Sequence, residues 1–285
     1  MDLRIATASG LVADDTRALP DGPVRVFGDA LVVGDRELFW HADAGWTRVG
    51  TAPGLRCAVD APGGLVVGTE GAHLLRRRGE GLVRIDGFEQ VPGRDDWYTP
   101  WGGPPEVRSL ACTADNVLLA NVHVGGIARS DDAGRTWTPT IDLHADVHQV
   151  RSVWGRGDLV VAAAAVGLCI STDGGRTWRV HSEGLDHTYC RAVAVPDAAI
   201  LVSASEGPRG RHSAIYRTSI HADRPFERVT DWMTGNVDTA ALDGMGERVV
   251  YGTPAGEVWE STDSGTTWDQ RHKNLAPVTS LSLVA

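Results

Sequence analysis

Five arginines occupy the same place in five short apolar segments, directly after the first apolar residue of each segment. They are Arg25, Arg56, Arg108, Arg151 and Arg191, and Asp238 and Thr279 take this place in two further segments. Neighbouring side chains of a strand point to opposite faces, so each arginine leaves the apolar face of its segment. A guanidinium can bind a carboxylate or a phosphate through two parallel hydrogen bonds. Convergence of these side chains would create an anion-binding site, and pairing of each arginine with a nearby carboxylate is the alternative.

Histidines form a second group that could do chemistry: His73, His123, His144, His148, His187 and His212. Imidazoles bind divalent transition metals and also act as general acids and bases. His144, Asp146 and His148 alternate with other residues, so an extended segment places all three side chains on one side. This spacing is less specific than an established metal-binding motif. Scattered surface histidines therefore remain the alternative.

Ring-bearing side chains are a third group: Trp97, Tyr98, Trp101, Tyr189 and Trp232. They could stack on a sugar or another ring, or fill gaps between packed elements. Cys190 is close to His187 in the sequence, which is compatible with a thiolate nucleophile. No local signature supports that role, so a buried structural cysteine is the favoured interpretation.

Composition and net charge indicate which partners and which cellular compartment to expect. The chain has 285 residues, and its formal net charge of −10 argues against a general nucleic-acid or anionic-membrane surface. Lys273 is the single lysine, so arginine carries nearly all positive charge. The first residues show neither a basic region nor a long apolar stretch, and the four cysteines form no CxxC pair. We therefore expect a cytoplasmic protein with reduced thiols and no membrane partner.

The chain is organised around an octapeptide, Ser-x-Asp-x-Gly-x-Thr-Trp, that occurs at residues 130–137, 171–178 and 261–268. It predicts a tight turn between two strands. The aspartates can fold back onto N–H groups of the turn, and the glycines allow a positive φ. The tryptophans should open the next strand and bury a large ring.

These octapeptides resemble the Asp-box, or BNR, repeat of YVTN/BNR-like β-propellers, which include sialidases, xyloglucanases, sortilin-type receptors and photosystem II assembly factors. The resemblance implies an all-β, seven-bladed β-propeller with blades of about 40 residues. Weaker copies of the turn occur at residues 41–47, 76–81 and 219–226. We expect one domain over residues 1–285, whose last blade is shared between residues 1–20 and 278–285. In that blade the C-terminal strand joins the N-terminal strands and closes the ring.

A propeller of this kind would direct the seven repeated positions into or beside its central channel. Its loop-rich face would carry the histidines and most of the ring-bearing residues. The sialidase-like or photosystem II assembly factor-like resemblance does not extend to the sialidase catalytic set. Arg4 and Ile5 are followed by Ala6 rather than proline, and no glutamate is evidently paired with Tyr189.

The sequence thus predicts a monomeric propeller that binds a small anionic ligand, or an acidic segment of a partner protein, through its five arginines. Trp97, Tyr98, Trp101, Tyr189, His123 and His212 are the further ligand-binding candidates. The first alternative is a lyase or hydrolase at the same channel mouth, with a divalent metal left open as cofactor. There His148 or His187 would move a proton, and Glu106 or Asp238 would orient that histidine. The second alternative is a structural protein-interaction platform.

Overall fold

The computed structural model describes residues 2–12, 19, 22–42, 45–142, 145–153 and 155–284. Strands dominate these residues and form seven antiparallel sheets, of which six have four strands and one has three. The fold is an all-β, seven-bladed β-propeller, as the repeats predict. Three predicted features lie wholly or partly outside the described residues. They are residues 13–18 of the predicted last blade, part of the weak turn copy at residues 41–47, and, separately, His144.

The strands of each sheet are as follows. The first four-stranded sheet contains β3 (Val24–Phe27), β4 (Ala30–Val33), β5 (Glu37–Ala42) and β6 (Gly45–Thr51). The second contains β7 (Leu55–Val59), β8 (Val66–Thr69), β9 (Leu74–Arg78) and β10 (Gly81–Arg84). The next two contain β11 (Val107–Cys112), β12 (Leu118–Val122), β13 (Gly126–Ser130) and β14 (Thr138–Pro139), then β15 (Val147–Ser152), β16 (Val160–Ala164), β17 (Gly167–Ser171) and β18 (Arg179–His181). The last two contain β19 (Tyr189–Ala194), β20 (Ala199–Ser205), β21 (Ala214–Ser219) and β22 (Glu227–Arg228), then β23 (Leu242–Met245), β24 (Arg248–Gly252), β25 (Val258–Ser261) and β26 (Asp269–His272). The three-stranded sheet combines β1 (Asp2–Thr7), β2 (Gly10–Val12) and β27 (Val278–Val284).

Residue contacts group the chain into two compact units. The first unit comprises residues 1–29, 163–168 and 180–285, and the second comprises residues 30–162 and 169–179. The expectation of a single domain stays a prediction. Among the described residues, no helix has both the length and the apolar character that a bilayer crossing requires.

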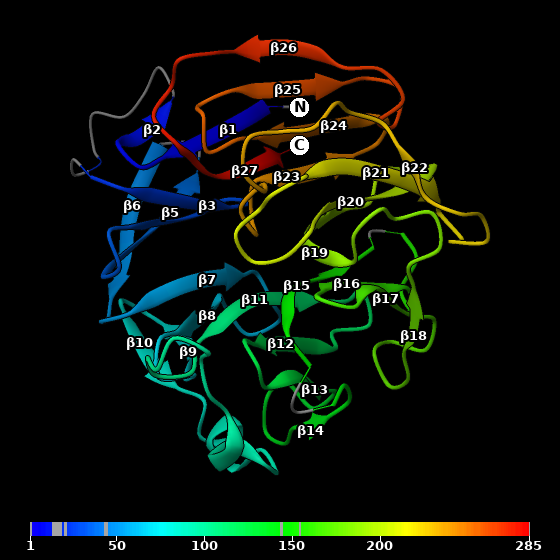
Figure 1. Ribbon diagram of the computed structural model, residues 1–285. Helices are drawn as coiled ribbons and strands as arrows, with labels where there is room; N and C mark the ends of the chain where they lie inside the picture. The colour runs from blue at the N-terminus through cyan, green and yellow to red at the C-terminus, as the bar shows by residue number, and fades with distance from the viewer. Residues whose placement is uncertain are drawn as a thin grey trace. The chain divides into compact units, whose positions relative to one another are not determined.

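In the first unit, the C-terminal strand joins the N-terminal strands, as predicted. β27 lies beside β1, with Ile5 opposite Leu281 (Figure 1). Both residues belong to one buried apolar cluster that also contains Leu201 and Ile215. Ser280 connects this sheet to β3, because its buried hydroxyl accepts a hydrogen bond from the Val26 N–H at 2.7 Å.

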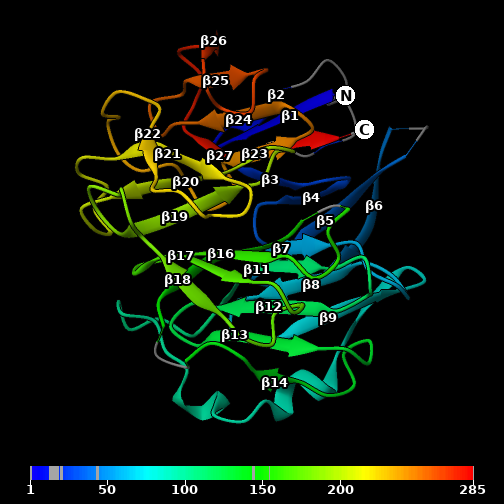
Figure 2. The ribbon, with the colours of Figure 1, turned by 90° about the vertical axis from the view of Figure 1, so that its right-hand side faces the viewer.

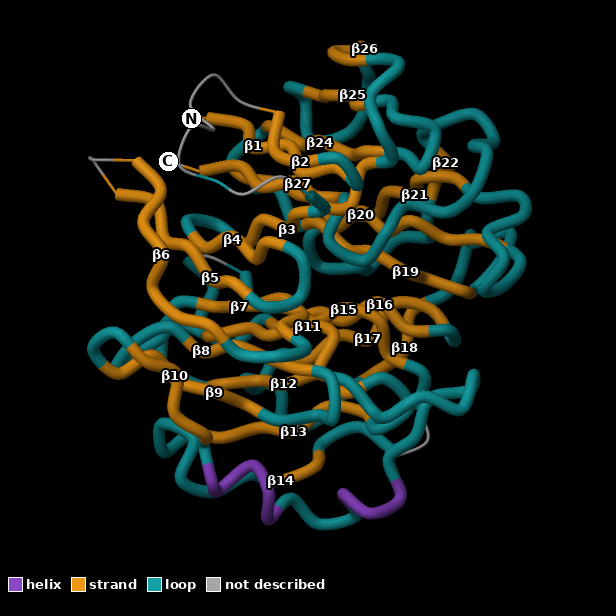
Figure 3. Tube along the Cα trace, turned by 90° about the vertical axis from the view of Figure 1, so that its left-hand side faces the viewer, coloured by secondary structure: helices purple, strands orange, loops and turns teal. Residues whose placement is uncertain are grey.

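In the second unit, innermost strands of neighbouring sheets are also bridged by side chains. β7 lies beside β11 (Figure 2), and the Cys57 thiol donates to the carbonyl oxygen of Val107. The Val150 N–H donates to the Ser109 hydroxyl at 2.9 Å. After β10 the chain forms two short 3₁₀ turns, η1 (Asp86–Gln90) and η2 (Arg94–Asp96), drawn in purple in Figure 3.

The repeated octapeptide forms the tight turn that its residues predict. In the first copy, Asp132 Oδ1 accepts from the Thr136 N–H at 2.9 Å and Asp132 Oδ2 from the Thr136 hydroxyl at 2.6 Å. The Gly134 N–H donates to the Ser130 hydroxyl at 2.9 Å, and Gly134 has a φ of 87°. The other two copies repeat these bonds, around Ser171, Asp173, Gly175 and Thr177 and around Ser261, Asp263, Gly265 and Thr267. One expectation is wrong: the fourth strands β14, β18 and β26 begin one residue after the tryptophan. Trp137 is still part of the turn, since its indole N–H donates to the Gly134 carbonyl.

Arginines fasten each of these turns to the preceding sheet. The donors are Arg76, Arg129 and Arg217, each on the third strand of its sheet, and the acceptors are the carbonyl oxygens of Ala133, Gly174 and Ser264 at 3.1, 2.9 and 2.9 Å. Every acceptor immediately precedes the glycine of a turn. These arginines therefore stabilise the contacts between successive sheets.

Candidate functional site

The repeated arginine position coincides with a β-bulge in several innermost strands. The pairing register shifts between Leu55 and Cys57, between Val107 and Ser109, and between Cys190 and Ala192, which leaves Arg56, Arg108 and Arg191 as the extra residues. Thr279 is the extra residue of β27 in the same way. A bulge re-aims one side chain while its neighbours keep their pairing. It explains why both neighbours of each arginine are buried while the arginine itself is half-buried.

In three of the seven segments, the repeated position is not the second residue of the innermost strand. β15 begins at Val147, so Arg151 is its fifth residue, and β19 begins at Tyr189, so Arg191 is its third. Asp238 lies before β23 rather than in it. Its carboxylate accepts from the Thr239 N–H at 2.8 Å and its carbonyl from the Ala241 N–H, because the chain turns here before the strand begins.

Carboxylates accompany two of the arginines. Arg56 contacts Glu106 at 3.1 Å and Glu70 at 2.9 Å, and Arg108 lies 3.5 Å from the same Glu106. Glu106 is thus an ion-pair partner of arginines and not the group that orients His148. Of the other arginines, Arg151 belongs to the second unit, and Arg25 and Arg191 to the first.

The second unit brings together His123, Asp146 and His148. His123 directly follows β12, His148 is the second residue of β15, and Asp146 precedes that strand. Nε2 of His123 and Nε2 of His148 lie 2.9 and 3.1 Å from Asp146 Oδ1. The two imidazoles are 2% and 0% exposed, so both histidines are almost fully withdrawn from water. The carboxylate that accompanies His148 is therefore Asp146.

Burial and the two neighbouring imidazoles act in opposite directions on the pKa of Asp146. Burial alone would raise the pKa of its carboxyl, but the imidazoles of His123 and His148 outweigh this and hold the pKa well below its usual range. The carboxylate is ionised at neutral pH. Among the described residues, these three side chains form the group that could hold a metal ion.

Trp101 covers this cluster on one side. Its ring lies on His123 with a centroid distance of 4.8 Å and is 64% exposed. The loop that presents it is braced by hydrogen bonds between Thr99 and its neighbours, including Gly102 N–H to Thr99 O at 3.0 Å. Tyr98 is also exposed, whereas Trp97 is buried against Phe88. Trp97 therefore anchors the loop, and of its three aromatic residues only Tyr98 and Trp101 are open to a ligand.

A second cluster forms in the first unit. The rings of His187 and His212 stack with a centroid distance of 5.9 Å, and Trp232 meets His212 at 5.7 Å. The Arg228 guanidinium lies over the Trp232 ring, 4.2 Å from its centroid. Tyr189 pairs with Ser205, which places it at the strand end from which the adjoining loop departs.

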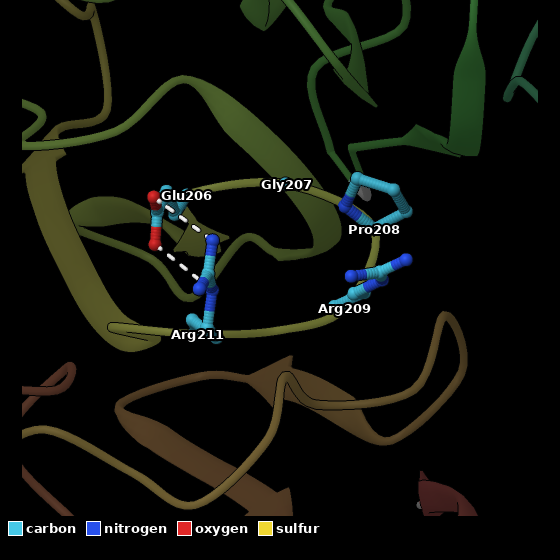
Figure 4. Close-up of a pocket in the computed structure, with 5 residues that line it drawn as sticks. All are labelled: Glu206, Gly207, Pro208, Arg209 and Arg211. Atoms are coloured by element: carbon cyan, nitrogen blue, oxygen red, sulfur yellow. Dashed lines mark hydrogen bonds and ion pairs between the residues drawn. The ribbon is translucent and has the colours of Figure 1, made fainter.

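That loop, Glu206 to His212, borders an open cleft of about 220 Å³ lined by Glu206, Gly207, Pro208, Arg209 and Arg211 (Figure 4). Glu206 faces Arg211 across it at 3.3 Å and lies 3.4 Å from His212. Arg209 and Arg211 are exposed, and no carboxylate of the described residues forms an ion pair with Arg209. Arg209, Arg211 and Arg228 are not among the site residues predicted from the sequence. For Arg209 and Arg211, the run of arginine and glycine in this loop was the available signal.

Burial and ion pairing indicate structural roles for Cys190 and His73. Cys190 is fully buried, which agrees with a structural role. His73 contacts Glu89 at 2.8 Å, and Glu89 also pairs with Arg94, so these groups brace the loop after β10.

Comparison with known proteins supports the fold but does not show a family. No family model matches the chain, and no curated protein matches it. An ancestral GH74 enzyme is 15% identical with a TM-score of 0.64, over 95% of this chain and 40% of that one. The GH74 xyloglucanase from Xanthomonas campestris is 16% identical with a TM-score of 0.62, over 94% of this chain and 46% of that one. The WD40 β-propeller domain of Doa1 is 13% identical with a TM-score of 0.60, over 97% and 81%.

The chain therefore spans less than half the length of these two GH74 enzymes. At such low identity the likeness concerns the fold alone.

Proposed function

We propose that this protein is a propeller of the Asp-box repeat class that binds a small anionic ligand at the cleft of residues 206–212. The observation that carries the proposal is that Arg209 and Arg211 line one cleft, and that Glu206, which also lines it, lies 3.4 Å from His212. Guanidinium groups are well suited to carboxylates and phosphates, and Arg209 has no competing carboxylate among the described residues.

Neighbouring side chains favour a ligand that also carries a ring. His212 contacts His187 and Trp232, and Arg228 covers one face of that indole. An exposed aromatic surface beside a cationic loop offers stacking and charge together. An acidic segment of a partner protein would use the same charges, and a cleft of about 220 Å³ has the size for a small anion.

The test is calorimetry and thermal-shift measurement with inorganic phosphate, citrate and benzoate. A ligand that binds only the native state raises Tm. We expect at least one anion to bind, and Arg209→Ala or Arg211→Ala to weaken it by about 10-fold or more, since charge-assisted hydrogen bonds are worth about 1.5–3 kcal/mol.

Arg224→Ala is the matched control. Arg224 is an exposed arginine that follows β21, at the opposite end of that strand from the cleft. It should leave anion binding unchanged. If no anion binds, or if all three variants bind alike, the cleft is not the site and an interaction platform becomes the better account.

A further inference from the structure

We propose that His123, Asp146 and His148 bind one divalent transition-metal ion. Among the described residues, this is the group in which three such side chains bring their ligand atoms within 4.8 Å of one another. Two imidazole nitrogens and one carboxylate oxygen form a donor set suited to zinc, copper, nickel or iron, and poorly suited to calcium or magnesium. The site lies in the second unit and is independent of the anion-binding cleft.

Hydrogen bonds hold the backbone at His123 and His148 in place without help from a metal. Asn121 in β12 donates from Nδ2 to the carbonyl oxygen of Val147 at 2.9 Å. The Ser109 hydroxyl accepts from the Val150 N–H at 2.9 Å, so β15 is fixed to the preceding sheet at two points. His123 N–H donates to the Glu106 carbonyl, which continues the pairing of β11 and β12. Because the ligands are positioned in advance, binding costs little conformational entropy.

The contacts within the cluster are better explained by a cation than by hydrogen bonding alone. Both Nε2 atoms approach the same oxygen, Asp146 Oδ1, yet this buried oxygen has no hydrogen bond of acceptable geometry. A buried polar atom that lacks a good hydrogen bond costs about 1–3 kcal/mol. An ion between the three side chains would receive a lone pair from each of them.

The cluster also leaves room for an exchangeable ligand. The Asp146 side chain is 27% exposed while both imidazoles are buried, so water reaches the cluster on the aspartate side. Three protein ligands with an open position are the arrangement of metal sites that bind water or substrate. Trp101, whose ring contacts His123, shields another side and places an indole next to the metal.

The experiment uses the untagged full-length protein, stripped with a chelator and titrated with Zn²⁺ and Cu²⁺ by calorimetry. We expect one ion per chain and an increase in Tm. Asp146→Asn should weaken binding by at least about 10-fold, the loss typical even of groups that only support a metal ligand. Asp142→Asn makes the same charge change in the same loop and should bind as the wild type does.

Two further measurements keep the test decisive if Asp146→Asn folds poorly. Electron paramagnetic resonance of the Cu²⁺ form should show coupling to two imidazole nitrogens. Cu²⁺ should quench tryptophan fluorescence, and Trp101→Phe should lose part of this quenching while keeping the stoichiometry. Absence of stoichiometric binding, equal affinity of the two asparagine variants, or a spectrum without two nitrogens would overturn the proposal.

Discussion

Arg129 and Arg209 carry the same guanidinium, and their surroundings give them different tasks. Arg129 is buried and donates to the carbonyl of Gly174, so it stabilises a turn of the next sheet. Arg209 is exposed and lines a cleft. Between these extremes, Arg56 is half-buried and paired with Glu70 and Glu106. Residue type alone does not separate the three tasks, because burial and pairing depend on the neighbours that folding supplies.

Asp132 shows how a turn residue makes the stability of the folded state depend on pH. The Thr136 hydroxyl and N–H donate to its carboxylate, and these bonds lower the pKa of Asp132 from 3.8 to about 2. The bonds favour the charged form, so the folded state binds a proton less readily than the unfolded state.

The stability from Asp132 is therefore fully present above its unfolded pKa and is lost as the pH falls through its folded pKa. We expect Asp132→Asn to lower the free energy of unfolding at about pH 6 and to have a smaller effect at about pH 2.5. Denaturant titrations of both proteins at the two pH values measure this difference. An equal effect at both values would show that the charge of Asp132 is not what the turn requires.

At the scale of the element, the octapeptide turn depends on glycine for two reasons. Gly265 has a φ of 85°, which side chains with a Cβ rarely adopt. A Cβ at this position would also lie well inside contact distance of Leu201 Cδ2 in β20. The turn and the neighbouring sheet therefore leave no room for even one methyl group.

We predict that Gly265→Ala lowers the free energy of unfolding by about 2–4 kcal/mol, of which backbone strain accounts for about 1 kcal/mol and overpacking for the rest. Gly28→Ala is the matched control, because Gly28 also has a positive φ (59°) but no atom within 4 Å of the added Cβ. Chemical denaturation of both variants isolates the packing cost. Equal losses would mean that Leu201 moves aside freely.

The β-bulges are a second feature at the scale of the element. The extra residue in β7, β11 and β19 is an arginine, and the residues on both sides of it stay buried. Strand alternation alone predicts that these arginines leave the apolar face. It does not predict the bulge, because a bulge depends on the register between two strands.

At the scale of the molecule, the two ends of the chain meet in one sheet. Ser280 in β27 is fully buried, and its hydroxyl accepts from Val26 N–H, 254 residues away in the sequence. A contact between residues so far apart in the sequence costs loop-closure entropy, which the other interactions of the fold must offset.

Ser280→Ala should lower the free energy of unfolding by about 1–3 kcal/mol, because it leaves the buried Val26 N–H without an acceptor. Ser280→Thr keeps the hydroxyl and is the conservative comparison. The measurement is equilibrium unfolding followed by tryptophan fluorescence. A neutral effect of Ser280→Ala would mean that this hydrogen bond adds nothing to the closure of the sheet.

Much of the fold could be read from local patterns. Asp132, Gly134 and Thr136 bond within one turn, and three copies of that turn imply repeated strands at a fixed spacing. The pairing of β27 with β1 also followed, because residues 278–285 match an innermost strand that has no partners after it. Interactions between residues close in sequence do not depend on the rest of the molecule, so the chain determines them by itself.

The candidate sites needed the tertiary structure. His123 and His148 meet on Asp146 because β12 and β15 belong to neighbouring sheets, and His212 meets His187 and Trp232 across separate loops. No local pattern specifies these distances. The tertiary structure also showed that Arg56 and Arg108 are accompanied by carboxylates whereas Arg209 lines an open cleft. Charge pairing and burial are properties of residues brought together from distant parts of the chain, and only the folded chain decides them.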